Sequence, residues 1–165
     1  MTTATAGISQ QADDLTLAMA LIDEKMRIPQ VHALLPHVPK ASLSRHYRKV
    51  HGGSSPSGLH RSEASYLFTP RIRPFASLYL LFYRSFRVCG YGVARATLEA
   101  WVYFKAFGGA SDYSINDRRL LTTAITDQEQ LGKRMARCKN SGALMIIATS
   151  EIKATFTYKA PRQAC

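Results

Sequence analysis

The stretch Arg27–His51, RIPQVHALLPHVPKASLSRHYRKVH, decides the fold of this chain. Pro29 suits the first turn of a helix, because its φ is already helical and it has no backbone N–H to leave without a partner. The segment Pro36–Pro39 should end that helix, since each of its prolines disfavours helical geometry in the residue before it. A second helix is predicted to begin at the last of these prolines or at Lys40 and to run to about Val50, where two glycines follow.

Each of the two predicted helices has an apolar and a polar side. The inward side of the second helix is predicted from apolar residues at i, i+4 and i+7, which are Leu43, Tyr47 and Val50. Its outward side holds basic and hydroxyl side chains, the candidate DNA contacts Lys40, Ser42, Ser44, Arg45, Arg48 and Lys49. A helix-turn-helix recognition helix has this division, with hydrogen-bond donors outside for phosphates and base edges. A basic face can also be merely solvated, because two short helices at a corner are common.

The 165-residue chain carries 22 basic and 11 acidic residues, and its net charge of +11 is unevenly distributed. Residues 27–73 have a net charge of +7 and residues 118–165 of +6, whereas residues 1–26 have −3 and residues 74–117 only +1. Two basic blocks on either side of a near-neutral one predict a polyanionic partner that is contacted in two places. No basic amphipathic helix with a large lipid-facing side is evident, so a membrane partner is not expected.

A supporting helix is predicted from Asp13 to Met26, with acidic residues in its first turn, where the helix dipole favours them. Its inward side chains would be Leu15, Met19, Ile22 and Met26. Residues 1–12 are small and polar and are expected to lie outside this helix. Residues 59–74 are expected to be irregular, with two exposed arginines, Arg71 and Arg73.

The segment 75–107 is the apolar centre of the chain, because 12 of the 16 aromatic residues lie between Tyr66 and Phe107. Two helices are predicted here, at residues 75–88 and 93–107, joined at a Gly-Tyr-Gly turn. Two arginines end the apolar run well short of the length that spans a bilayer. So many aromatic side chains exceed what a small domain can bury, which favours an obligate protein interface.

The predicted fold class is mainly α, a helix-turn-helix plus a helical core, with a small C-terminal β-hairpin unit. A further helix is predicted over residues 117–137, followed by a hairpin of residues 143–148 and 154–158. Two domains are expected on this basis. Residues 1–110 would form the helical domain, and residues 111–165 the last helix and the hairpin unit.

The histidines, acids and cysteines do not form a catalytic pattern. No histidine lies four residues from another, so a metal site is not expected among them. All five are expected to bond phosphates or face solvent: His32, His37, His46, His51 and His60. The acid pairs 13–14 and 23–24 are interpreted as solvated helix charges. An enzyme is not expected, because the chain lacks a Gly-rich phosphate loop, a nucleophile elbow and Cys-x-x-Cys. Three cysteines without a disulfide framework, and a start without signal-peptide character, predict a cytoplasmic protein.

Four segments follow one another in the order and at the spacing of a known family. They are Gln11-Ala-Asp-Asp-Leu-x-Leu-Ala-Met-x-Leu-Ile22; Leu43-x-x-x-Tyr47-Arg48-Lys49-Val50 leading into Gly53-Ser-Ser-Pro-Ser-Gly58; Tyr66-Leu-Phe68; and Gly92-Val93 ahead of Ala100-Trp101-x-x-Phe104. Over residues 10–107 the chain resembles the FlhC family of flagellar master regulator subunits.

The resemblance implies a mostly helical protein that assembles with FlhD into a hetero-oligomer, binds double-stranded flagellar promoter DNA and helps to recruit RNA polymerase. It also implies a C-terminal zinc-binding unit resembling a zinc ribbon, with two Cys-x-x-Cys pairs around a hairpin. Cys138 and Cys165 match the first cysteine of each pair, but Ser141 occupies the second position of the first pair and the sequence ends at Cys165. A closed structural zinc site needs four ligands. The implied zinc would therefore have only two of its four thiolates.

Two functions fit these observations. The first is a DNA-binding transcriptional activator subunit that acts with an FlhD-like partner at the promoters of flagellar (class 2) operons. The alternative is a paralogue that binds the FlhD-like partner but has lost promoter-specific activity together with its zinc ligands. A general RNA- or DNA-binding protein would instead show salt-sensitive binding without sequence preference.

Overall fold

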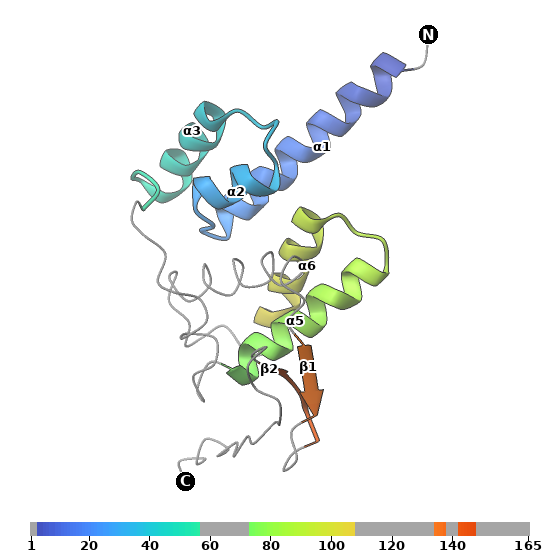
Figure 1. The fold of residues 1–165 in the computed structure, drawn as a ribbon. Coiled ribbons are helices and arrows are strands. Elements are labelled where there is room, and N and C mark those ends of the chain that lie inside the picture. Colours follow the sequence, from blue (N-terminus) through green and yellow to red (C-terminus); the bar gives the residue numbers. More distant parts are fainter. Residues whose placement is uncertain (1–2, 57–72, 108–133, 138–141, 148–165) are drawn as a thin grey trace.

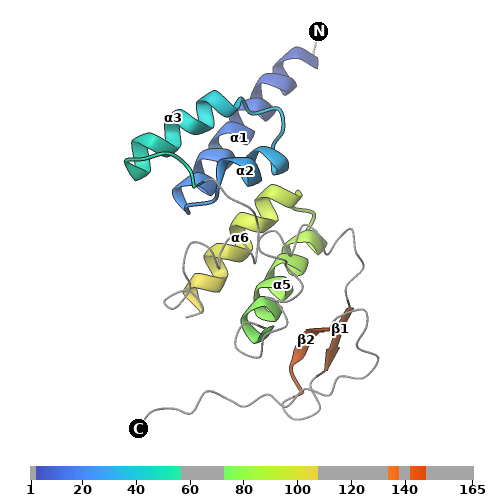
Figure 2. The same ribbon diagram turned by 60° about the vertical axis from the view of Figure 1, so that its left-hand side comes forward.

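The computed structural model describes residues 3–56, 73–107, 134–137 and 142–147, which are mainly helical (Figures 1 and 2). The helices and strands are α1 Thr3–Asp23, α2 Ile28–Leu34, α3 Lys40–His51, α5 Arg73–Val88, α6 Val93–Ala106, β1 Arg134–Arg137 and β2 Leu144–Ile147. None of the helices in these ranges is long and apolar enough to cross a membrane.

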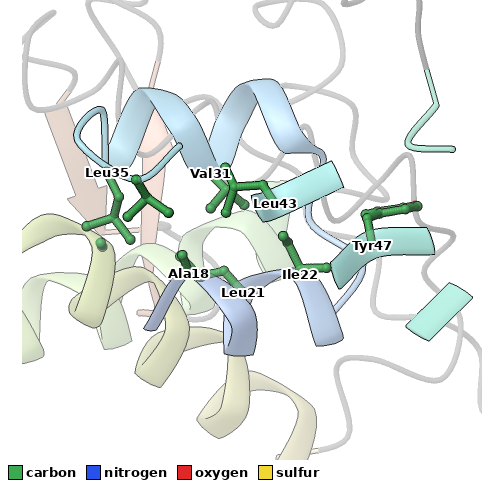
Figure 3. Close-up of a cluster of buried hydrophobic side chains, with 9 residues drawn as sticks. Ala18, Leu21, Ile22, Val31, Leu35, Leu43 and Tyr47 are labelled. Atoms are coloured by element: carbon green, nitrogen blue, oxygen red, sulfur yellow. The ribbon is translucent and has the colours of Figure 1, made fainter. Parts of the chain in front are cut away.

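The first three helices share one apolar core and form a three-helix unit (Figure 3). Its buried members come from each helix and from the turn after α2, and include Ala18, Leu21, Ile22, Val31, Leu35, Leu43 and Tyr47. The two helices predicted within residues 27–51 are present, and the corner between them lies where the prolines placed it. α1 packs behind both of them, as expected of the supporting helix.

The bounds of α1 differ from the prediction at both ends. The helix begins at Thr3 rather than Asp13, so the acids expected in its first turn lie in its middle. The alanines and glutamines between residues 4 and 12 explain this start, because they are good helix formers despite their small or polar side chains. The helix ends at Asp23 because Lys25 adopts a φ of 65° and the Met26 N–H donates to the Leu21 carbonyl at 3.0 Å. This closure normally uses glycine, so lysine gave no stop signal in the sequence.

α5 and α6 form an antiparallel helical pair, joined where the Gly-Tyr-Gly turn was predicted. The small buried residues Ala96 and Ala100 leave room for large rings between the helices, including Tyr79, Tyr83, Trp101 and Phe104. The Tyr79 hydroxyl donates to the Thr97 carbonyl at 3.1 Å, which satisfies a buried polar group. α5 begins at Arg73, so this arginine belongs to a packed first turn and is buried. Its predicted exposure is wrong, and Arg71 lies outside the described residues.

Five aromatic side chains form a continuous row at the surface of α5 and α6, which we call the aromatic face: Phe82, Phe86, Tyr91, Tyr103 and Phe107. Successive ring centroids along the row are 5.2–6.1 Å apart. Tyr103 is 47% exposed and Phe107 is 68% exposed. The described part of the chain therefore leaves part of its aromatic surface uncovered, in line with the excess of aromatic residues in the sequence.

Glu24, the first residue after α1, contributes polar contacts between the three-helix unit and the helical pair. The Glu24 carboxylate accepts a hydrogen bond from Trp101 Nε1 at 2.8 Å and forms an ion pair with Lys105 Nζ. Both partners lie on α6, 77 and 81 residues further along the chain. α6 also contributes Ala94 to the core of the three-helix unit. Glu24 is therefore not the solvated helix charge that the sequence indicated.

We expect the Glu24→Ala variant to lose about 1–2 kcal/mol of unfolding free energy, because charge-assisted hydrogen bonds contribute up to about 3 kcal/mol and this one is partly exposed. Glu99→Ala is the matched control, since Glu99 lies on α6 and pairs with Arg95 of that helix at the surface. Its loss should stay below about 0.5 kcal/mol, as for other exposed i, i+4 pairs. Urea unfolding measures both values, and equal losses would contradict the role of Glu24.

The C-terminal hairpin differs from the predicted one. β1 pairs antiparallel with β2, with Arg134 opposite Ile147 and Arg137 opposite Leu144. The predicted helix is thus wrong over residues 134–137, which form β1 and pair with β2. β2 lies within the predicted strand 143–148, and residues 154–158 lie outside the described part. β2 also packs on α5 with Met145 buried, and such tertiary pairing overrides the helix propensity of β1. A zinc ribbon is not shown among the described residues.

Candidate nucleic-acid interface

α3 lies at an edge of the molecule (Figures 1 and 2). Its main contacts are with α1 and α2, whereas α6 packs on another side of that unit. Leu43 and Tyr47 anchor the inner side of α3 in the core. The outer side is directed away from the other described helices.

The sequence fixes both ends of α3. Pro39 is the N-cap in an extended conformation, and Gly52 is the C-cap with a φ of 70°. The Gly52 N–H donates to the Arg48 carbonyl at 2.9 Å, which satisfies one of the last carbonyls of the helix. Basic residues occupy the last turn, where the negative end of the helix dipole favours them. The position of the basic face is therefore specified locally.

Replacing Gly52 with alanine should lower the free energy of unfolding by about 1 kcal/mol, because alanine adopts a positive φ at a cost of that order. No atom lies within 4 Å of the added methyl group, so backbone strain is the only expected cause. Gly53→Ala is the control, because Gly53 does not have a positive φ. Thermal unfolding of the two variants measures the difference, and equal midpoints would show that the αL cap does not stabilise α3.

The structure leaves all the predicted basic residues of α3 exposed, with Arg45, Arg48 and Lys49 on the outer side and Lys40 at the start of the helix. No ion pair to a described acid involves any of these four side chains. Ser42 and Ser44 are half-buried at the two margins of this surface. Ala41 is exposed and precedes Arg45 by four residues, so it lies in the middle of the surface. Ala41 was not among the predicted contacts, because a lone alanine carries no chemical signal in a sequence.

The first turn of α3 adds backbone donors to this surface. The N–H groups of Lys40 and Ala41 have no hydrogen-bond partner in the described part of the chain, and the first turn holds no acid. Such a helix start has a partial positive charge and can accept a phosphate oxygen. Arginine side chains further along the helix can reach base edges with two parallel hydrogen bonds. The surface can therefore hold a nucleic-acid backbone and read bases.

Three histidines predicted to meet phosphate or solvent bind groups of α1 or near it. His46 Nε2 lies 2.7 Å from Asp23 Oδ1, and His37 Nε2 lies 2.8 Å from Asp14 Oδ2. His51 Nε2 donates to the Ile22 carbonyl at 2.8 Å. These contacts fasten α3 and the turn before it to α1. His46 and His51 are therefore not the solvent-facing residues that were predicted, whereas His37 is exposed, as predicted, beside its partner. His60 lies outside the described residues.

His51 also explains why Val50 is not buried as predicted. The His51 ring lies 4.6 Å from the Tyr47 ring, measured between centroids, and reaches the end of α1. At the last turn of α3, α1 therefore lies on the side that holds His51. Val50 is left 44% exposed beside the basic surface.

The described residues provide no group of three or more histidine, cysteine or acidic side chains that could hold a metal ion. Cys138 and Cys165 lie outside the described ranges, and Cys89, which lies within them, is exposed. Zinc at Cys138 and Cys165 therefore stays an expectation of the resemblance, which implies a site of four ligands.

The basic surface of α3 is thus the site in the described part of the chain with the clearest chemical character. It combines exposed arginines and lysines, open backbone donors and a firmly packed inner side. No model of a known protein family matches the chain, and a search of curated protein sequences gave no significant match.

Proposed function

We propose that the chain is a DNA-binding transcriptional activator subunit that acts with an FlhD-like partner at the promoters of flagellar (class 2) operons. The observation that carries the proposal is the basic surface of α3, exposed at an edge of the molecule behind a proline-defined corner. In this proposal α2 and α3 are a helix-turn-helix and α3 is its recognition helix.

The proposal gives each side chain of the basic surface a role. Arg45 and Arg48 lie near the middle of the surface and would read base edges in the major groove, which is wide enough to admit a helix. Lys40, Lys49, Ser42 and Ser44 lie at its start and margins and would hold phosphates. The net charge of +7 over residues 27–73 supports this assignment, because counterion release by basic side chains provides much of the affinity for DNA.

The choice of partner rests on the resemblance together with the aromatic face. An FlhD-like subunit would cover the exposed rings of Tyr91, Tyr103 and Phe107 in a hetero-oligomer. Aromatic side chains are enriched in protein interfaces, which supports this placement. RNA polymerase is the further partner that the resemblance implies, and such a subunit would work in the cytoplasm. Zinc held by Cys138 and Cys165 remains an expectation of the resemblance alone.

A promoter reporter tests the proposal. In a bacterial strain that lacks its own FlhC, the chain should raise transcription from a flagellar class 2 promoter, and only when FlhD is present. No rise in transcription with both proteins expressed would contradict the activator function.

The alternative, a paralogue that binds the FlhD-like partner without promoter activity, is favoured by Ser141 in the position of a zinc-ligating cysteine. It predicts that the chain lowers reporter transcription in a strain that keeps its own FlhC, because the two would compete for FlhD.

A further inference from the structure

We propose that Asp23 and Glu24 form a positioning clamp that fixes the direction of α3 relative to α5 and α6, and that this clamp sets promoter selectivity. The inference deepens the proposed function and rests on it. Neither residue belongs to the DNA-binding surface described above. Both act through the elements that they hold.

The clamp consists of two consecutive carboxylates that bind two different parts of the fold. Asp23 Oδ1 lies 2.7 Å from Nε2 of His46, which is on α3. Glu24 Oε2 accepts from Trp101 Nε1 at 2.8 Å, and the other Glu24 oxygen pairs with Lys105. The end of α1 thus connects the basic surface to α6 through adjacent side chains.

The backbone between these contacts is held in place. The Lys25 N–H donates to the Ile22 carbonyl at 2.7 Å, and Lys25 has a φ of 65°. The same Ile22 carbonyl accepts the bond from His51, which ties the end of α3 to the end of α1. Several hydrogen bonds therefore hold the backbone of this turn, from which both carboxylates extend.

α1 and α2 link α3 to the helical pair. α3 has its main contacts with α1 and α2, and those two helices are the ones that contact α6 (Figure 2). A change in the α1–α6 joint would therefore turn the whole basic surface relative to α5 and α6. The partner proposed for the aromatic face would turn with them.

The direction of α3 should affect selectivity for the promoter more than it affects affinity for DNA of any sequence. Contacts to phosphates tolerate small shifts and occur on any sequence, whereas contacts to base edges require the side chain to be placed to within a fraction of an ångström. A loosened clamp should therefore weaken binding to the promoter and leave binding to unrelated DNA nearly unchanged. A purely structural role for Glu24 would weaken both by the same factor.

The test compares Kd for a flagellar promoter fragment with Kd for a scrambled duplex of equal length, using the full chain with an FlhD subunit. Glu24→Ala should lower the promoter-to-scrambled selectivity about tenfold, the effect of losing about one base contact, with scrambled binding within about twofold of wild type. Glu24→Gln keeps an acceptor for Trp101 and should rescue part of the selectivity. Glu99→Ala also removes one negative charge, but from the surface of α6, and should leave the selectivity unchanged.

Three results would overturn the inference. Unchanged selectivity in Glu24→Ala, with a selective wild type, would show that the clamp is wrong while the proposed function stands. If Glu24→Ala lost affinity for both duplexes by the same factor, together with helical circular dichroism, Glu24 would only stabilise the fold. In that case Glu24→Gln, if folded, would show no loss of selectivity. A wild-type protein without promoter preference would overturn the proposed function and the clamp together.

Discussion

The Arg45→Ala, Arg48→Ala double variant is expected to bind a flagellar promoter at least about 30-fold more weakly than the wild type, because each arginine contact to a base contributes about 1–3 kcal/mol. Both side chains lie on the exposed side of α3 and take part in no ion pair to a described acid. Their removal should therefore leave the fold intact. Fluorescence anisotropy with a labelled promoter fragment measures the loss, and circular dichroism checks the helix content.

The matched control for this variant is Arg95→Ala. Arg95 is an exposed arginine on α6 that pairs with Glu99, on an element away from the basic surface. Promoter binding of Arg95→Ala should stay within about threefold of wild type, the effect of one long-range charge at physiological salt. Equal losses in the two variants would mean that net charge, and not the α3 surface, determines binding.

Leu43→Ala should have the largest effect on stability among substitutions in α3, a loss of about 2–5 kcal/mol of unfolding free energy. The Leu43 side chain is 1% exposed in the core shared by α1, α2 and α3, so its truncation leaves a cavity behind the basic surface. Chemical denaturation by urea measures the change. Promoter binding should fall as well, because α3 would no longer be held at a fixed angle.

Val50→Ala is the informative comparison, since sequence periodicity placed Val50 in the same buried stripe as Leu43. With Val50 exposed, the expected loss is below about 0.5 kcal/mol, as for most surface substitutions. A loss comparable to that of Leu43→Ala would show that Val50 is buried and that the placement of His51 in the last turn is wrong.

The prolines and glycines made much of the helical fold predictable. Pro29 and the segment Pro36–Pro39 set the bounds of α2 and the start of α3, and the Gly-Tyr-Gly turn set the corner between α5 and α6. These residues act locally, through φ preferences and missing N–H groups, so no tertiary information was needed. The basic side of α3 was predictable for the same reason, since periodicity alone separates it from Leu43 and Tyr47.

The rest depended on contacts between distant segments, which a single sequence does not reveal. The end of α1 requires a positive φ at Lys25, where the usual glycine is absent. The sequence of β1 predicts a helix, and only its pairing with β2 makes it a strand. His46 and Glu24 gained their roles only when α3 and α6 were brought next to the end of α1. Clustered charges and histidines look solvated in a sequence, because their partners lie far along the chain.

The most direct test of the account measures binding of the wild-type chain, with an FlhD subunit, to a flagellar promoter fragment and to a scrambled duplex at two salt concentrations. Binding to the scrambled duplex should fall steeply with salt, because released counterions dominate it. Binding to the promoter should remain tight at the higher salt and should require FlhD. Capture of FlhD with equal affinity for the two duplexes would contradict the account and would favour the paralogue that has lost promoter recognition.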